Sequence, residues 1–255
     1  MSTGNKPGPD ASHLDQIRTL YTELAETPEK DFGWGKGKDN ARILGYADEW
    51  LRAIPNVVWE SAAAVGNPFS IGPIETGQTV VDLGCGAGAD ACVAALLVGS
   101  KGRVIGIDCT PAMITKARGN ASACGLFNLE FHEADMTSLP VDTATADFVL
   151  SNGAINLSHD KRRVLAEAYR VLRAGGRIQI ADMVRDPSEG GTVCCASDES
   201  WANCVSGTLE PNEFIALMEQ AGFSNVRLVA YNGYRTAQQT EGALFYGEKA
   251  SGRTL

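Results

Sequence analysis

The stretch Thr79-Val80-Val81-Asp82-Leu83-Gly84-Cys85-Gly86-Ala87-Gly88 decides the fold. Its first half is apolar enough for a buried strand, and its three alternate glycines predict a tight turn. An apolar run from Asp90 to Val98, closed by Gly99, predicts the helix that follows. Glycines at such a turn let the backbone approach a ligand, and the helix start offers free N–H groups. The dinucleotide fingerprint needs its third glycine one residue later, so a smaller adenosyl ligand is favoured over a pyrophosphate.

Outward from this turn, strands alternate with helices to the end of the chain. Further strands are expected at 103–108, 128–133, 146–151, 177–184, 225–231 and 243–248, and further helices at 110–124, 159–172 and 211–221. The alternation predicts an α/β protein whose parallel sheet carries helices on both faces. The last two strands have no helix between them, which suggests an antiparallel edge.

The segment before the turn is a mixture of helices and loops. Apolar residues at helical spacing predict helices over 13–26 and 41–54, and Gly and Pro interrupt the residues that follow. The expected regions are a disordered leader (1–13), a helical lid (14–76) and a ligand-binding core (77–250) with a substrate-side insertion (185–210). Trp34, Trp50 and Trp59 are candidates to cover the pocket as part of this lid, and plain packing is the alternative for them.

Composition excludes several classes of partner. The 255 residues are 44% hydrophobic and 21% charged, and 22 basic against 31 acidic residues give a net charge of −9. This balance argues against nucleic acid and against an anionic membrane as partners. The longest apolar run, Ala91 to Val98, is too short to span a bilayer, and the first residues lack signal-peptide features. We therefore expect a cytoplasmic protein whose seven cysteines are reduced.

Polar residues stand at the ends of the second, third and fourth expected strands. Asp108 can accept both ribose hydroxyls of an adenosyl group, and Asp135 can accept from its exocyclic amine while the Met136 N–H donates to the ring. Asn152 ends the fourth strand. Open α/β sheets bind ligands at the carboxyl ends of their strands, so these residues favour one shared site. The alternative for each residue is a turn former or helix cap.

Four motifs together resemble the class I S-adenosylmethionine-dependent methyltransferases. They are V-D-L-G-C-G-A-G (81–88), the acidic end of strand two, A-D-M (134–136) and R-V-L-R-x-G-G-R (170–177). The resemblance covers residues 79–184 and implies a seven-stranded Rossmann-like sheet with the last strand inserted antiparallel. It implies S-adenosylmethionine as cofactor and adds Asp82, Gly84, Gly86 and Cys109 to the residues expected to bind it.

Further segments look like those of arsenite methyltransferases. They are 106–113, 151–157 with 160–161, 167–173, 180–183 and, most specifically, Trp201-x-x-Cys204-x-x-Gly207-x-Leu209. That family usually binds trivalent arsenic through three or four cysteines. Here Gly153 stands where one of them is expected, no cysteine precedes Cys85, and Cys204 alone matches directly. Arsenic is a soft ion that prefers thiolates, so Cys204 is the expected substrate residue, with Cys194 and Cys195 as its helpers.

Several alternatives stay open at this point. The acceptor is expected to be a small molecule, including a thiol-bound metalloid; another soft nucleophile (thiol, sulfide or selenide) or a carbon, oxygen or nitrogen acceptor would use the same fold. A non-catalytic sensor of the adenosyl ligand or of a thiophilic metalloid is a third possibility. His13, His132 and His159 do not have metal-site spacing, so no catalytic metal is expected. Cys92 and Cys124 are expected to fill the core, and the sequence leaves the oligomeric state open.

Overall fold

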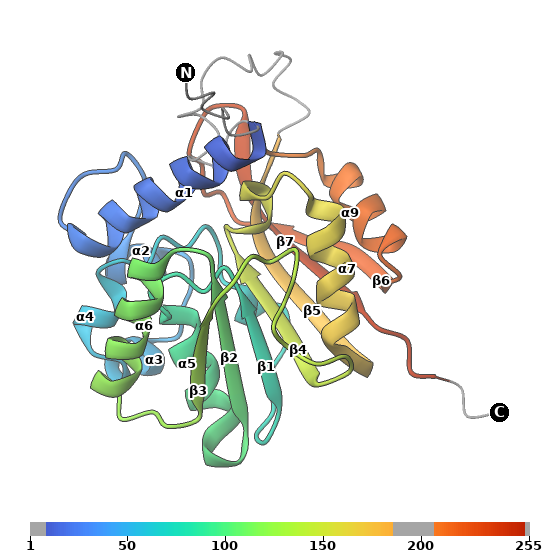
Figure 1. Cartoon of the computed structure of the whole chain (residues 1–255), viewed down its shortest axis with the longest axis horizontal. Helices are drawn as coiled ribbons and strands as arrows, with labels where there is room; N and C mark the ends of the chain where they lie inside the picture. The colour runs from blue at the N-terminus through green and yellow to red at the C-terminus, as the bar shows by residue number, and fades with distance from the viewer. Residues whose placement is uncertain (1–8, 186–206, 253–255) are drawn as a thin grey trace, which may run out of the picture.

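A seven-stranded sheet forms the centre of the computed structural model, which describes residues 9–185 and 207–252 (Figure 1). The strands are β1 (Thr79–Leu83), β2 (Arg103–Asp108), β3 (Leu129–Glu133), β4 (Ala146–Asn152), β5 (Leu172–Arg185), β6 (Ser224–Tyr231) and β7 (Thr240–Glu248). Their order across the sheet is β3-β2-β1-β4-β5-β7-β6, and β7 runs antiparallel to both of its neighbours. The expected α/β sheet is confirmed. The strand at the edge is β6, and β7 is the inserted antiparallel strand.

Helices cover both faces of this sheet. They are α1 (Pro9–Glu26), α2 (Gly37–Ile43), α3 (Asp48–Ala53), α4 (Asn56–Trp59), α5 (Ala89–Val98), α6 (Pro111–Ala123), α7 (Lys161–Val171) and α9 (Pro211–Gln220), with short 3-10 turns η1 (Pro68–Ser70), η2 (Gly99–Lys101) and η3 (Ile155–Leu157). Neighbouring residues of β1 enter opposite cores. Val80 packs with α5 and α6, and Val81 packs with α7 and α9. Burial on both faces explains why two apolar residues follow each other at Val80 and Val81.

The chain departs from the sequence-based boundaries where β5 begins. The pair Gly175-Gly176 does not close α7, because the helix already ends at Val171. Instead Gly175 N–H donates to the Lys249 carbonyl and Lys249 N–H donates to the Gly176 carbonyl, both at 2.8 Å. The glycines therefore extend the sheet toward the C-terminal end of β7.

The N-terminal region also differs in detail. The single helix expected over 41–54 is broken into α2 and α3, because Gly45 takes a left-handed φ of +82° and Tyr46 turns into the core. Helix α1 already begins at Pro9, inside the range expected as leader. It lies across the carboxyl ends of the central strands (Figure 1). In the parts of the chain described, none of the helices is both long and apolar enough to cross a membrane.

Candidate functional site

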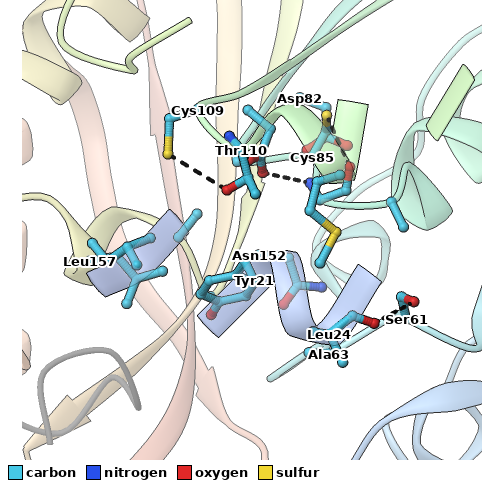
Figure 2. Close-up of a pocket in the computed structure, with 18 of the residues that line it drawn as sticks. Tyr21, Leu24, Ser61, Ala63, Asp82, Cys85, Cys109, Thr110, Asn152 and Leu157 are labelled. Carbon is cyan, nitrogen blue, oxygen red and sulfur yellow. Dashed lines mark hydrogen bonds between the residues drawn. The ribbon is translucent and has the colours of Figure 1, made fainter. Parts of the chain in front are cut away.

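A pocket opens at the carboxyl ends of β1, β2 and β4, beneath α1 (Figure 2). It holds about 1050 Å³ of space, counting that at its open mouth. Its floor is the glycine turn after β1, and its cover comes from Leu14, Ile17, Tyr21 and Leu24 of α1. This is the position expected of a small-molecule site in an open α/β sheet.

The structure brings every residue expected to bind the cofactor to the wall of this one pocket. They are Asp82, Gly84, Gly86, Asp108, Cys109, Asp135, Met136 and Asn152. Gly153, where the resemblance would place a cysteine, also lines it. The three expected substrate cysteines, Cys194, Cys195 and Cys204, lie outside the described residues.

Asp108 joins the end of β2 to the glycine turn. Its Oδ2 accepts a hydrogen bond from Gly86 N–H at 2.9 Å, and its Oδ1 accepts from Thr110 N–H at 2.8 Å. Burial raises the pKa of this carboxyl, while the hydrogen bonds from Thr110 and Gly86 act in the opposite direction. Asp108 therefore ties the end of β2 to the glycine turn, and its binding of ribose hydroxyls stays a prediction.

The glycine turn depends on glycine for two separate reasons. Gly84 and Gly86 have φ values of +70° and +51°, in the left-handed region that favours glycine. A Cβ atom added to Gly84 would lie 2.2 Å from the Cβ of Ala154, which follows β4. A side chain there would therefore separate the floor of the pocket from its far wall.

Asp82 carries a buried carboxylate oxygen without a partner. The residue is 2% exposed, and its Oδ2 accepts no hydrogen bond from any described residue. Burial raises its pKa well above the ordinary value, and the nearby Asp90 and Asp108 raise it further. A cationic ligand group would reduce this penalty. The sulfonium and ammonium groups of S-adenosylmethionine supply such charge, so the donor set fits that cofactor.

Both the oxygen and the nitrogen of the Asn152 side-chain amide form hydrogen bonds within the protein. Its Oδ1 accepts from Val65 N–H at 3.0 Å, and its Nδ2 donates to Asp90 Oδ2 at 2.8 Å and to the Gly66 carbonyl at 2.9 Å. Tyr46 completes the network by donating to Asp90 Oδ1 at 2.7 Å. Asn152 thus organises the pocket wall. Sequence reasoning missed Asp90 and Tyr46; the acidic residue in the first turn of α5 was a signal for Asp90, and nothing marked Tyr46.

Asp135 has a local structural role beside its place in the wall. It is exposed, and its Oδ1 accepts from Thr137 N–H at 2.8 Å and from Thr137 Oγ1 at 2.7 Å. This is the turn-capping role that the sequence left open as an alternative. The second carboxylate oxygen remains for an amine donor, so adenine binding by Asp135 and Met136 stays a prediction.

Cys109 faces the underside of α1. Its side chain packs with the apolar cluster that contains Ile17 and Leu157, and burial followed by the nearby Asp108 raises its pKa to about 11. The thiol is therefore protonated at neutral pH. The Cys109 carbonyl accepts from Arg18 Nε of α1 at 3.0 Å, so the end of β2 is tied to the helix that covers the pocket.

Trp50 and Trp59 pack in the core and do not cover the pocket, which confirms the alternative of plain packing for them. No tryptophan of the described chain lines the pocket; Trp59 is 1% exposed within the core beside α5, and Trp50 packs against the same core. Tyr21 of α1 is the aromatic residue at the cover. The expected core cysteines behave as predicted: Cys92 is fully buried, and Cys124 packs against the same cluster.

Comparison with known proteins agrees with this geometry. A family model described as a methyltransferase domain matches residues 74–222. The arsenite methyltransferase of Halobacterium salinarum is 40% identical over 163 residues, which is 64% of this chain and 41% of that protein. The arsenite methyltransferase of Aquipseudomonas alcaligenes is 37% identical over 60% of this chain and 46% of its own length. The chain thus spans less than half the length of these relatives.

A solved structure extends the similarity. The arsenic(III) S-adenosylmethionine methyltransferase of Chlamydomonas reinhardtii superposes with a TM-score of 0.61 at 30% identity, over 86% of this chain and 75% of that one. A geranyl diphosphate C-methyltransferase from Streptomyces coelicolor shares the fold with a TM-score of 0.67 at 16% identity. From the glycine turn to the inserted β7, the chain belongs to the class I S-adenosylmethionine-dependent methyltransferases and resembles the arsenite methyltransferases among them.

Proposed function

We propose that the protein transfers a methyl group from S-adenosylmethionine to trivalent arsenic, as arsenite or methylarsenite. The observation that carries this proposal is the similarity to arsenite methyltransferases, which reaches 40% identity in sequence and 30% in a solved structure. The pocket supports it, because neither a histidine nor a lysine lines its described wall as a general base. Arsenic reacts through its own lone pair and needs none, whereas an amine or alcohol acceptor must lose a proton.

When bound, S-adenosylmethionine supplies a methyl group on a sulfonium sulfur, which the arsenic lone pair takes by displacement as the carbon–sulfur bond breaks. The protein's contribution is to align the two partners and exclude water. Asp108 and the glycine turn fix the adenosyl end, and the apolar side chains of α1 close the pocket over the reacting atoms. Asp82 stabilises the positive charge of the cofactor.

Binding of the arsenic acceptor is assigned to Cys204, with Cys194 or Cys195 as a second thiol ligand. Two described residues support this assignment. Arg185 at the carboxyl end of β5 donates its N–H to the Leu209 carbonyl at 2.9 Å. The residues on either side of the segment that carries the cysteines therefore meet at the carboxyl end of β5. This end of β5 adjoins the pocket, because Gly153, which lines the pocket, donates its N–H to the Ala181 carbonyl of β5 at 2.8 Å.

Substitution of Cys204 tests the proposal. Cys204→Ser is expected to leave S-adenosylmethionine affinity unchanged by calorimetry and to reduce methyl transfer to arsenite and methylarsenite strongly. Cys124→Ser, at the far end of α6, is the matched control. The Cys194→Ser/Cys195→Ser double variant is expected to weaken arsenite binding.

The acceptor panel also contains sulfide, methanethiol and selenite, with labelled S-adenosylmethionine as donor. Transfer to these acceptors without transfer to arsenic would favour a different soft nucleophile. If Cys204→Ser keeps full turnover on every acceptor, the arsenic assignment fails and a carbon, oxygen or nitrogen acceptor takes its place.

A further inference from the structure

Two thiols outside the pocket meet where α5 packs beside the end of α6. Cys92 of α5 is fully buried, and Cys124, the residue that ends α6, is half-buried and packs against the cluster that contains Cys92. The Cys92 thiol donates a hydrogen bond to the Cys124 sulfur. Neither residue lines the pocket, and the proposed methyl transfer uses neither.

The surrounding backbone holds these two helices together. Asn128, which follows the end of α6, donates its Nδ2 to the Ala95 carbonyl at 3.2 Å and to the Gly99 carbonyl at 2.9 Å, at positions that follow Cys92 along α5. Helix α6 itself is terminated by Gly125, whose φ is +65°. The contact between the two sulfurs therefore belongs to a packed interface between helices.

The two thiols differ in acidity and in access to solvent. The hydrogen bond from Cys92 lowers the pKa of Cys124, whereas that same bond and burial raise the pKa of Cys92. Burial also raises the pKa of Cys85 and of Cys109, so Cys124 alone among the four cysteines of the described residues has a lowered pKa. An accessible thiolate beside a second thiol is the arrangement of a redox-sensitive cysteine and its resolving partner.

We propose that Cys92 and Cys124 form a reversible disulfide when the protein meets a hydroperoxide. The Cys124 thiolate attacks one oxygen of hydrogen peroxide, the O–O bond breaks, and the released hydroxide takes up a proton to become water. The Cys92 thiol then attacks the sulfur of the resulting Cys124 sulfenic acid. The S–O bond breaks, and its hydroxyl leaves with the Cys92 proton as a second water. Two electrons thus pass from the two sulfurs to the peroxide.

The cross-link joins two helices that both begin at the pocket. Helix α5 follows the glycine turn, and Met113 near the start of α6 lines the pocket wall. The disulfide closes a loop that contains β2 and all of α6, so it removes conformational freedom from the unfolded chain. We therefore expect the oxidised protein to be more stable to heat than the reduced protein.

Disulfide mapping of the full chain tests the proposal. Reduced protein is freed of reductant, treated with hydrogen peroxide and alkylated, and its peptides are analysed by mass spectrometry. A link between Cys92 and Cys124 is expected as the main product, with a Tm about 5 °C above that of the reduced protein, and dithiothreitol should reverse both changes.

Two variants separate the steps of the reaction. In Cys92→Ala, which keeps the core apolar, oxidation of Cys124 is expected to stop at the sulfenic acid, which dimedone traps. Cys109→Ser removes a thiol at the end of β2 and is the matched control; it should form the link as the wild-type protein does.

Three results would overturn the inference. They are a Cys124 that stays reduced, a main disulfide between other cysteines, and an equal rise in Tm on oxidation of Cys92→Ala. Methyl transfer is not the readout, because the proposed acceptor ligands Cys194, Cys195 and Cys204 are thiols that peroxide also oxidises. The result therefore concerns this pair of thiols and leaves the proposed arsenic function standing or falling on its own test.

Discussion

The two ends of the pocket are built in different ways. At the cofactor end, each functional side chain is held by a neighbour in its own or the adjacent strand–turn unit: Asp108 by Gly86 and Thr110, and Asp135 by Thr137. At the acceptor end, the partners are far apart in the sequence. Gly153 N–H donates to the Ala181 carbonyl, and the ring of His13 hydrogen-bonds to the Leu157 carbonyl. Short motifs therefore determine the cofactor end, and the tertiary fold determines the acceptor end.

The largest effect is expected at the cofactor end. Asp108→Ala removes the acceptor of two backbone N–H groups and of the expected ribose hydroxyls, at about 1.5–3 kcal/mol for each charge-assisted bond. We expect S-adenosylmethionine affinity to fall by about tenfold or more in calorimetry. Asp142→Ala, at an exposed carboxylate outside the pocket wall, is the control. Unchanged affinity in the Asp108 variant would remove our placement of the cofactor.

The long-range network around Asn152 is tested by removing one hydroxyl. Tyr46→Phe deprives the buried Asp90 of a hydrogen bond of 2.7 Å and leaves its Oδ1 without that donor. We expect the free energy of unfolding to fall by about 2 kcal/mol in urea titrations, with a smaller loss of cofactor affinity than for Asp108→Ala. Tyr231→Phe, at an exposed tyrosine of β6, should change neither quantity. A larger loss of cofactor affinity than of stability would mean that Tyr46 belongs to the cofactor end.

Gly153 offers a way to restore a thiol at the acceptor end. Its φ is +68°, and an added Cβ would lie 3.2 Å from Val65 Cγ1. We expect Gly153→Cys and Gly153→Ala to lose about 1–2 kcal/mol of stability alike, because both place a side chain in the left-handed region. The cysteine variant alone should bind arsenite more tightly. If the alanine variant shows the same gain, the effect does not come from the thiol.

The features that could be predicted from the sequence are those set by short motifs, and the features that could not are those set by the tertiary fold. The glycine turn, the strand ends and the parallel core were predictable, because apolar strands and Gly-rich turns are local signals. The partners of Asn152 were not, since nothing in the sequence places Tyr46 or Val65 beside it. The tryptophans stayed undecided for a related reason. A large apolar side chain is compatible with a lid and with a core, and the packing of Trp59 beside α5 shows that this residue belongs to the core.

A buried carboxylate beneath the acceptor end gives the last comparison. Asp182 of β5 is fully buried; its Oδ1 accepts from Asn156 Nδ2 at 2.9 Å and from Met183 N–H at 2.8 Å, and its Oδ2 accepts from Asn156 N–H at 3.2 Å. These bonds hold η3, whose Leu157 lines the pocket. Burial raises the pKa of Asp182 to about 6, while the hydrogen bonds from Met183 and Asn156 and the charge of Lys161 act against it.

A pKa of about 6 lies above the ordinary value of 3.8, so the folded protein binds this proton more tightly than the unfolded chain does. The contribution of this proton to stability is therefore present in full below pH 3.8 and is lost as the pH rises through 6. Between about pH 7 and pH 5, we expect the wild-type protein to gain on the order of 1 kcal/mol relative to Asp182→Asn, which cannot titrate. Urea unfolding of both proteins at a series of pH values measures the difference, with Asp142→Asn as control. A difference that does not vary with pH would show that the carboxylate stays ionised throughout, and that η3 is held by a permanent charge.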